Sequence, residues 1–383
     1  MTKVAVQFGA GGIGRGFTAQ LFHESSYEVV FVDVNLPVVA ALNARRGYAI
    51  SIVGDNPETI PITDVRAILG TDIEAVAEAV ASADIVCTAV GANALPYIAP
   101  AMAEGLRRRT EPLNIILCEN LHDAADVMRK AVEGHLPEEE RDSVLSRTGF
   151  VQAVVARMVP VPTEADKAVD VLAVRVEAYK RLPIDAKAIV GAWSPIENVE
   201  PVENFEAWVE RKLYVHNCLH AVLGYAGVRA GYEYGWQALE DTGIFALLCN
   251  ISAEIEVALT AKHQLDTREL RDHTDDLMCR FKNKELGDTC RRLARDPIRK
   301  LALDDRLIGT MRLCQEYSEV PFELIAVISH AINYTDPDDP SAEKLRMMRE
   351  EHGIDHVLRE VCHIDPAEPL GMQIKQCMES EPQ

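Results

Sequence analysis

The sequence predicts an α/β protein in which a doubly wound parallel sheet is followed by a mainly α-helical C-terminal domain. Short apolar runs alternate with helical stretches in the first half of the 383 residues, and the second half has the pattern of successive helices. A glycine-rich turn directly after the first apolar run is the third observation. The chain is 48% hydrophobic and 26% charged, which is typical of a folded globular protein, and it is long enough for two domains.

The expected strands of the first half are β-branched, apolar runs of the kind found in buried parallel sheets. They are Lys3–Phe8, Glu28–Asp33, Asp84–Val90 and Leu113–Cys118. Helical stretches such as Ile73–Ala81 and Ala94–Leu106 lie between them, which gives the βαβ order of a doubly wound sheet. We expect Gly47–Pro61 to insert a hairpin and Asp170–Tyr179 to form the last strand of this half.

The second half is expected to begin near residue 190. From Asn204 onward helical patterns follow one another, and the breaks between them carry glycine, proline or a capping aspartate. These breaks are Gly231, Asp266, Pro297, Pro321 and Pro337. The predicted domains are therefore residues 1–190 and residues 191–383.

The charge of the chain limits its partners. Sixty acidic residues against 39 basic ones give a net charge of −21. Nucleic acids and anionic membranes require clustered cations, so neither is expected as a partner. No apolar run is expected to be long enough to span a bilayer, and MTKVAVQF at the N-terminus has the pattern of a strand rather than of a signal peptide.

The cysteines and histidines indicate a reduced protein without a metal site. The nine cysteines are scattered and form no C-x-x-C pair, which is typical of free thiols in the cytoplasm. Near the C-terminus His352, His356, Cys362 and His363 cluster in sequence. Their surroundings have the pattern of a solvated helix and turn, so we expect no metal there.

A dinucleotide-binding fingerprint follows the first strand. Gly9, Gly11 and Gly14 occupy the G-x-G-x-x-G positions, with Ala10, Gly12 and Ile13 between them. The first glycine permits a tight turn, the second admits a pyrophosphate, and the third allows helix and strand to pack closely. The helix that follows directs its N–H groups at the phosphates. The pattern predicts a Rossmann-type domain.

An acidic residue ends the second strand at the expected position. Asp33 lies 19 residues after Gly14, close to the ~20 typical of a carboxylate that binds the ribose hydroxyls. A carboxylate there repels a 2′-phosphate, so NAD is the expected cofactor rather than NADP. Arg15 either adds charge near the pyrophosphate or lies on the surface. Thr88, Val90 and Gly91 either flank the nicotinamide or form a plain strand-end turn.

The segment Trp208–Gly224 (WVERKLYVHNCLHAVLG) is the most informative part of the second half. At 100° per residue, Asn217 lies ~140° and His220 ~80° around the helix from Lys212. The rest of this helix is apolar nearly all round, which is typical of a buried helix. Burial lowers the pKa of a lysine and makes it a candidate general base, although a lysine at the rim of the core fits the spacing as well.

At this point the sequence resembles the polyol-specific long-chain dehydrogenases. FGAGGIGRGF and RKLYVHNCLHAVLGYAG carry the resemblance, which continues through Asp33–Asn35, Thr88–Gly91 and Asn114–Asn120 and is strong again from Arg280 to Ile308. The length matches the shorter branch of the family, which acts on mannitol 1-phosphate. The resemblance implies an NAD-dependent interconversion of mannitol 1-phosphate and fructose 6-phosphate without a metal.

The resemblance also implies roles for single residues. Lys212 would be the general acid/base, Asn217 and His220 would bind the reacting oxygen and neighbouring hydroxyls, and Asn120 would help to hold the alkoxide. A phosphorylated substrate needs a cationic pocket in this acidic chain, and basic residues gather between positions 280 and 306. The candidates for phosphate binding are Arg280, Arg295, Arg299 and Lys300, of which Arg295 and Lys300 are preferred.

Two elements depart from the family pattern. Ala156 precedes Arg157 where the family often has aspartate, and Lys180-Arg181-Leu182 stands where an acidic residue and a tryptophan are common. These changes are compatible with a phosphorylated substrate, with a sugar-acid substrate, or with surface substitutions that have no functional meaning. They leave open a related polyol-phosphate or hexuronate-type reductase, and a non-catalytic NAD-binding sensor is a third hypothesis. The expected assembly is a monomer or a weak homo-oligomer.

Overall fold

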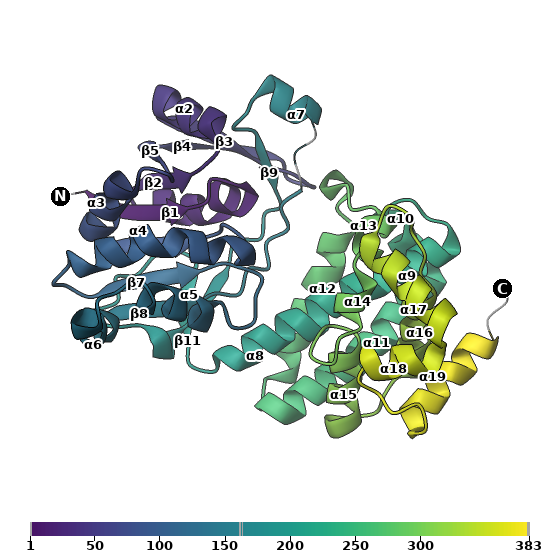
Figure 1. Cartoon of the computed structure of the whole chain (residues 1–383). Helices are drawn as coiled ribbons and strands as arrows, with labels where there is room; N and C mark the ends of the chain where they lie inside the picture. Colours follow the sequence, from purple (N-terminus) through teal and green to yellow (C-terminus); the bar gives the residue numbers. More distant parts are fainter. Residues whose placement is uncertain (1, 161, 163, 381–383) are drawn as a thin grey trace. The chain divides into compact units, whose positions relative to one another are not determined.

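The computed structural model describes residues 2–160, 162 and 164–380 (Figure 1). The chain divides into two compact units, Met1–Trp208 and Val209–Gln383. The division lies later than the boundary expected near residue 190, because the segment after that point still packs on the first unit. Ile196 and Val199 are buried in the same hydrophobic cluster as the strands.

The first unit contains three groups of strands. The six-stranded sheet has the order β5-β2-β1-β6-β7-β8, a three-stranded sheet has the order β4-β3-β9, and β10 pairs with β11. The strands are β1 (Lys3–Phe8), β2 (Tyr27–Asp33), β3 (Gly47–Ile52), β4 (Glu58–Thr63), β5 (Val65–Leu69), β6 (Ile85–Thr88), β7 (Leu113–Leu117), β8 (Thr148–Gln152), β9 (Val174–Val176), β10 (Leu182–Asp185) and β11 (Val199–Val202).

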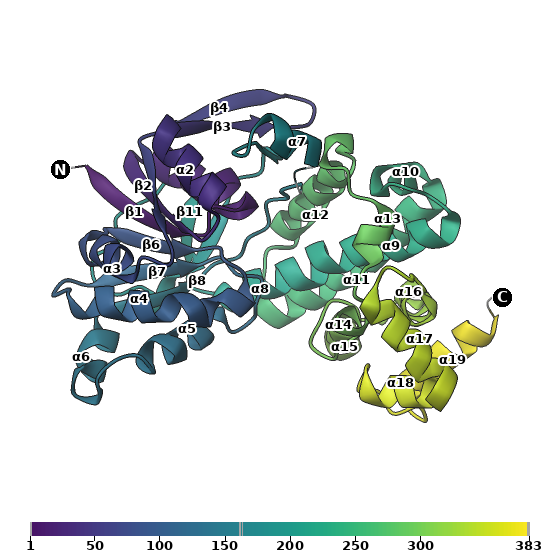
Figure 2. The same ribbon diagram turned by 45° about the horizontal axis from the view of Figure 1, so that its top comes forward.

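All pairings in the six-stranded sheet are parallel, which confirms the predicted fold class. The expected hairpin is present as β3 and β4, and Figure 2 shows it as a long antiparallel pair near α2. The expected strand Asp170–Tyr179 is shorter and pairs in parallel with β3 rather than with the main sheet. Asp170 turns the chain before this strand, since its side chain accepts the N–H of Leu172.

Helices connect these strands. They are η1 (Gly14–Thr18), α1 (Ala19–Glu24), α2 (Leu36–Arg45), α3 (Ile73–Ser82), η2 (Ala92–Ala94), α4 (Leu95–Arg107), α5 (Ala124–Glu133), η3 (Glu138–Glu140), α6 (Arg141–Ser146), α7 (Glu164–Val169), η4 (Ala186–Ala188) and α8 (Phe205–Glu210), which crosses the division between the units. Among them η1 is a π-helix, and η2, η3 and η4 are short 3₁₀ turns.

Each face of the main sheet is covered by its own hydrophobic cluster. On one face, side chains of α3, α4, α5 and α6 pack on alternate residues of the strands, such as Val6, Val30 and Val86. Figure 1 shows α3, α4 and α5 together along this sheet. On the other face, α1, α2 and the β3–β4 hairpin pack on residues such as Ala5 and Val29. Because successive side chains of a strand point to opposite faces, this division follows from the apolar runs in the sequence.

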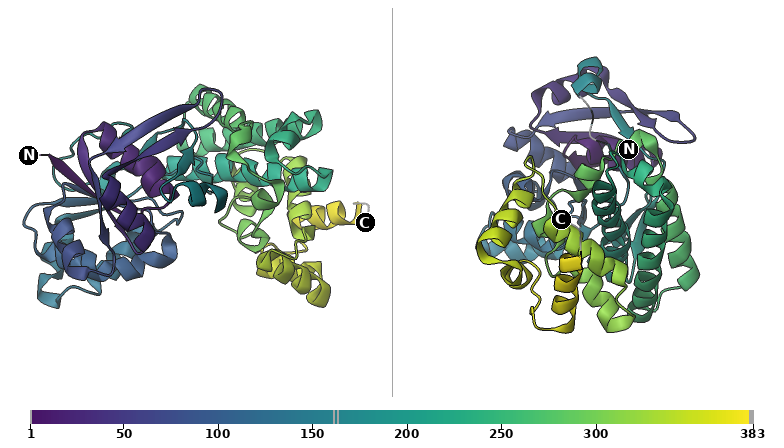
Figure 3. Two further views of the ribbon diagram at one scale, coloured as in Figure 1. Left: turned by 90° about the horizontal axis from the view of Figure 1, so that it is seen from above. Right: turned by 90° about the vertical axis from the view of Figure 1, so that its right-hand side faces the viewer.

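The second unit is built of helices, drawn from green to yellow in Figure 3. They are η5 (Arg211–Asn217), α9 (Cys218–Ala230), α10 (Gly235–Glu240), α11 (Thr242–His263), α12 (Thr267–Phe281), η6 (Lys284–Leu286), α13 (Cys290–Ala294), α14 (Pro297–Lys300), α15 (Ile308–Tyr317), α16 (Phe322–Asn333), α17 (Pro340–His352), α18 (Ile354–Glu360) and α19 (Pro369–Ser380). Gly231 ends α9 in the left-handed conformation, and the side chain of Asp266 caps the first N–H groups of α12.

One helix differs from the expectation that no apolar run is long enough to span a bilayer. By length and composition, α11 could cross a membrane, since it has 22 residues and a mean hydropathy of 1.6 over an 18-residue window. In the structure it packs against α9, α10, α12 and α15, and residues such as Leu248, Ile251 and Ile255 are buried. A central helix of a helical unit is apolar for this reason.

Candidate functional site

The glycine loop connects β1 to the first helix of the six-stranded sheet. Gly9 has φ +88°, and a Cβ there would lie 2.5 Å from the carbonyl oxygen of Ala89. A Cβ on Gly14 would lie 1.9 Å from the carbonyl oxygen of Gly9, whereas no atom lies within 4 Å of the Cβ position of Gly11. Gly9 and Gly14 therefore hold the loop closed, and Gly11 leaves the open backbone surface that a pyrophosphate requires.

Asp33 is fixed at the end of the neighbouring strand β2. Its carboxylate accepts the N–H of Ala10 at 2.6 Å and the N–H of Asn35 at 2.8 Å. The carboxylate thus lies beside the glycine loop, as the spacing in the sequence predicts. This arrangement fits a dinucleotide whose ribose hydroxyls bind Asp33 and whose pyrophosphate binds the backbone of the glycine loop.

Arg15 is buried, with 6% of its surface exposed, so the surface alternative for its side chain does not hold. Desolvation lowers the pKa of its guanidinium. Its backbone carbonyl accepts the hydroxyl of Tyr48 at 2.7 Å, which attaches the glycine-loop helix to β3. Gln7, which no motif in the sequence indicates, supports the same loop: its amide donates to the carbonyl of Phe8 and accepts the hydroxyl of Thr18.

The turn Thr88–Gly91 follows β6, and Cys118–Asn120 follows β7. A buried carboxylate joins them: Glu119 accepts the Thr88 hydroxyl at 2.6 Å and the Val90 N–H at 3.0 Å. Burial raises the pKa of Glu119, although these hydrogen bonds oppose the rise. The family resemblance points to Asn120 and not to Glu119, which only the pairing of β6 with β7 connects to Thr88. Asn120 itself is exposed and belongs to the first unit.

Basic side chains in the two segments that depart from the family pattern form hydrogen bonds and ion pairs with other groups of the first unit. The guanidinium of Arg157 is buried and donates to the carbonyls of Gly16 and Glu177 and to the side chain of Gln20, at 2.7–3.0 Å. Lys180 pairs with Glu24 at 2.8 Å. These cations bind groups of their own unit, so they add no support for an anionic substrate.

Lys212 and Asn217 lie in a π-helix, Arg211–Asn217, and not in the continuous α-helix that the periodicity of the sequence predicts. In a π-helix the backbone hydrogen bond joins residues five apart. Lys212 and Asn217 are five apart, so they lie about one turn from each other on one face, closer than the α-helical count of ~140° predicts. π-helical turns are frequent at functional sites. Asn217 is buried and Lys212 is partly buried.

The environment of Lys212 favours the neutral amine. Burial lowers its pKa to about 8, and the nearby cations Arg306 and Arg299 act in the same direction against Asp305. A lysine with an ordinary pKa is almost fully protonated at neutral pH. Lys212 can therefore exchange a proton near the pH at which enzymes work.

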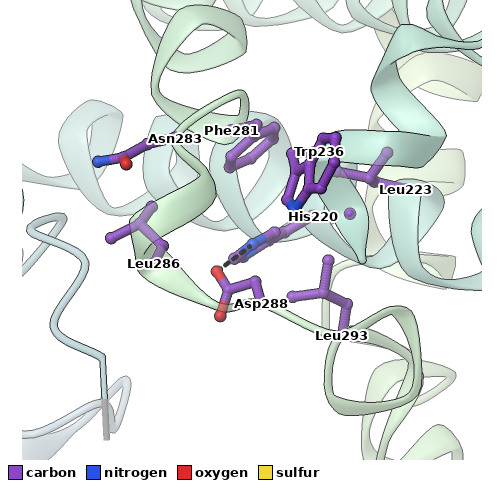
Figure 4. A pocket seen from close by; sticks show the side chains of 9 residues that line it. His220, Leu223, Trp236, Phe281, Asn283, Leu286, Asp288 and Leu293 are labelled. Carbon is purple, nitrogen blue, oxygen red and sulfur yellow. Dashed lines mark ion pairs between the residues drawn. The ribbon is translucent and has the colours of Figure 1, made fainter. Parts of the chain in front are cut away.

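His220 follows one turn later and lines a small pocket (Figure 4). The pocket encloses about 240 Å³, part of it open to solvent, and Trp236 and Phe281 are among its walls. The imidazole stacks on Phe281 with the ring centroids 4.6 Å apart, and its Nε2 lies 3.4 Å from the carboxylate of Asp288. Burial and neighbouring cations lower the pKa of His220 to about 3, so the ring is neutral at pH 7.

The basic stretch from Arg280 to Arg306 contains mostly paired cations. Arg299 pairs with Asp296 at 2.7 Å, and Arg280 lies 3.7 Å from Asp276 and lowers the pKa values of both His216 and His220.

Lys300, one of the two preferred candidates for phosphate binding, contacts backbone groups close to it in sequence. Its ammonium is buried and donates to the backbone carbonyls of Leu293 and Arg295, because these carbonyls at the end of α13 lack helical partners. The side chain of Arg295 is exposed, and among the residues that the structure describes it has no ion pair or side-chain hydrogen bond. Of the two preferred candidates, only Arg295 presents its cation to solvent.

No group of three or more histidine, cysteine, aspartate or glutamate side chains with the geometry of a metal site occurs in the part of the chain that the structure describes. The rings of His352 and His356 lie 4.7 Å apart, and Cys362 is buried. The nine cysteines are free thiols.

Comparisons with known proteins cover nearly the whole chain. The family model described as the mannitol dehydrogenase Rossmann domain matches residues 3–198, and the model of the mannitol dehydrogenase C-terminal domain matches residues 204–376. The mannitol-1-phosphate 5-dehydrogenase of Shouchella clausii is 37% identical over 369 residues, which cover 96% of this chain and 98% of the relative. The enzyme of the same name from Brevibacillus brevis is 36% identical over 371 residues, covering 96% of this chain and 95% of the relative.

Solved structures agree on the fold. The mannitol 2-dehydrogenase of Pseudomonas fluorescens, solved as a ternary complex with NAD and D-mannitol, has a TM-score of 0.76 at 17% identity, over 99% of this chain and 92% of that chain. A D-sorbitol dehydrogenase in substrate-free form has the same TM-score and identity, over 98% of this chain and 91% of that chain.

Proposed function

Because this chain belongs to the mannitol dehydrogenase family, we propose that it is an NAD-dependent polyol-phosphate dehydrogenase that interconverts mannitol 1-phosphate and fructose 6-phosphate. The observation that carries the proposal is the π-helix with Lys212 and Asn217 on one face, in which Lys212 has a pKa of about 8. Relatives at 36–37% identity over nearly full length carry the name of this activity.

The first unit would hold the cofactor. Gly11 offers the open backbone for the pyrophosphate, and Asp33 offers its carboxylate to the ribose. NAD, when bound, accepts a hydride from the carbon that is oxidised. The carboxylate of Asp33 disfavours a 2′-phosphate by charge repulsion, which supports NAD over NADP.

The second unit would supply the proton chemistry. During polyol oxidation the neutral Nζ of Lys212 takes the proton of the reacting hydroxyl, and during ketose reduction the ammonium returns it. The amide of Asn217 would donate to the oxygen on which negative charge develops. His220, neutral at pH 7, would bind a neighbouring hydroxyl. An amine and amide donors would thus act in place of a metal ion.

The phosphate would be bound by Arg295, since its guanidinium is exposed and arginine binds phosphate in a bidentate manner. Most other cations of the stretch pair with acidic groups. A phosphorylated substrate would therefore have in Arg295 a charged partner that a free polyol cannot use.

The test is a screen for NADH formation over hexitol phosphates, pentitol phosphates, free polyols and aldonic acids. We expect turnover with mannitol 1-phosphate in the presence of NAD. Arg295→Met should raise KM for the phosphorylated substrate by at least about tenfold, because a bidentate charged contact is lost. Arg291→Met is the matched control, since Arg291 pairs with Asp336 and Asp338. Absence of turnover on every phosphorylated polyol would overturn the proposal.

A further inference from the structure

Glu119 is a buried carboxylate without a cationic partner. Only 6% of its surface is exposed. Its two oxygens accept the Thr88 hydroxyl at 2.6 Å and the Val90 N–H at 3.0 Å. Both contacts are donors, and a carboxylate in its ionised form is an acceptor only. No lysine, arginine or histidine pairs with Glu119 within the described residues, so its charge is not neutralised nearby.

The sheet order places Glu119 with respect to a bound dinucleotide. Asp33 lies on the β2 side of β1, whereas Thr88 and Glu119 lie at the ends of β6 and β7 on the other side. A dinucleotide crosses a doubly wound sheet at the point where the strand order reverses, which here lies between β1 and β6. If its adenosine ribose meets Asp33, the nicotinamide half extends toward the ends of β6 and β7.

We propose that Glu119 sets the preference between the two redox forms of the cofactor: its carboxylate stabilises the oxidised, positively charged nicotinamide ring relative to the neutral reduced ring. This inference rests on the proposed use of NAD. The pyrophosphate carries the same charge in both forms, so the ring is where their charges differ. An unpaired carboxylate in buried surroundings is weakly screened and acts more strongly than a surface charge.

A purely structural role makes a different prediction. If Glu119 only fixes the turn Thr88–Gly91, replacing it weakens the binding of both cofactor forms by the same factor. If its charge acts on the ring, replacing it weakens the binding of NAD⁺ more than the binding of NADH. The ratio of the two dissociation constants therefore separates charge from geometry.

The experiment measures Kd for NAD⁺ and for NADH by isothermal titration calorimetry at pH 8. Glu119→Gln keeps the shape and removes the charge, and we expect it to weaken NAD⁺ relative to NADH by about fivefold. Thr88→Val removes one hydrogen bond and leaves the charge, so both constants should rise by the same factor. Glu139→Gln removes an exposed charge and should leave both constants unchanged.

If Glu119→Gln weakens the binding of NAD⁺ and of NADH equally, Glu119 only holds the turn in place, and the inference is overturned. If Glu119→Gln does not fold, Glu119→Met takes its place: it also removes the charge and should weaken the binding of NAD⁺ more than that of NADH, and equal weakening would again overturn the inference. Failure of the wild-type chain to bind either form would instead refute the proposed use of NAD.

Discussion

Replacement of Lys212 by alanine is the most direct test of the proposed chemistry. With a pKa of about 8, about one Lys212 in eleven is neutral at pH 7, against about one in three thousand for an ordinary lysine pKa near 10.5. The environment of Lys212 therefore raises the population of the base by roughly 300-fold. Lys212→Ala should leave NAD binding nearly unchanged and lower kcat for polyol oxidation by about a hundred- to ten-thousand-fold.

The assay is the pH dependence of kcat/KM in both directions. The neutral amine is the base for oxidation, so the oxidation rate should rise about tenfold per pH unit below pH 8 and level off above it. Reduction needs the ammonium, so its rate should fall as the pH rises through about 8. Small primary amines added to Lys212→Ala should restore part of the oxidation rate.

Lys344→Ala, which removes an exposed lysine of α17, is the matched control and should behave like the wild type. An oxidation rate that does not change between pH 6 and pH 9.5 would refute the role of Lys212. Lys212→Ala with more than about a tenth of the wild-type kcat would refute it as well, since general acid–base catalysis contributes at least about 10².

Three further predictions concern the first unit. Asp33→Ala removes the acceptor of the Ala10 N–H and the charge that repels a 2′-phosphate, so calorimetry should show Kd for NAD rising at least about tenfold while NADP binding improves; an unchanged NAD-to-NADP ratio would contradict this. Gly9→Ala places a Cβ 2.5 Å from a backbone oxygen at φ +88° and should lower the free energy of unfolding by about 1–3 kcal/mol in urea titrations. The control is Gly134→Ala, whose Cβ position has no atom within 3.4 Å. Its free energy of unfolding should stay within about 0.5 kcal/mol of the wild-type value. Arg157→Met removes buried hydrogen bonds to the carbonyls of Gly16 and Glu177 and to the Gln20 side chain and should destabilise the unit by about 3 kcal/mol. A wild-type midpoint in the same titration would show that these contacts contribute nothing.

Much of the first unit could be predicted from local pattern. β-branched runs, glycine spacing and the position of Asp33 depend on backbone sterics and on alternation along one strand, and both are properties of neighbouring residues. The structure places Gly9, Gly11 and Asp33 together for these reasons. Helices of the second half were predictable in the same way, because their breaks carry capping and helix-ending residues such as Asp266 and Gly231.

Tertiary structure decided the features that depend on contacts between distant residues. Glu119 accepts the Thr88 hydroxyl only because β6 pairs with β7. Lys300 donates to a backbone carbonyl that has no helical partner because α13 ends there. The π-helical register of Lys212 and Asn217 is the clearest case. Periodicity in the sequence indicates a buried helix but does not distinguish i→i+4 from i→i+5 hydrogen bonds, because packing around the helix selects between them. The sequence alone thus determined which residues could carry out the chemistry, and the fold determined which of them face one another.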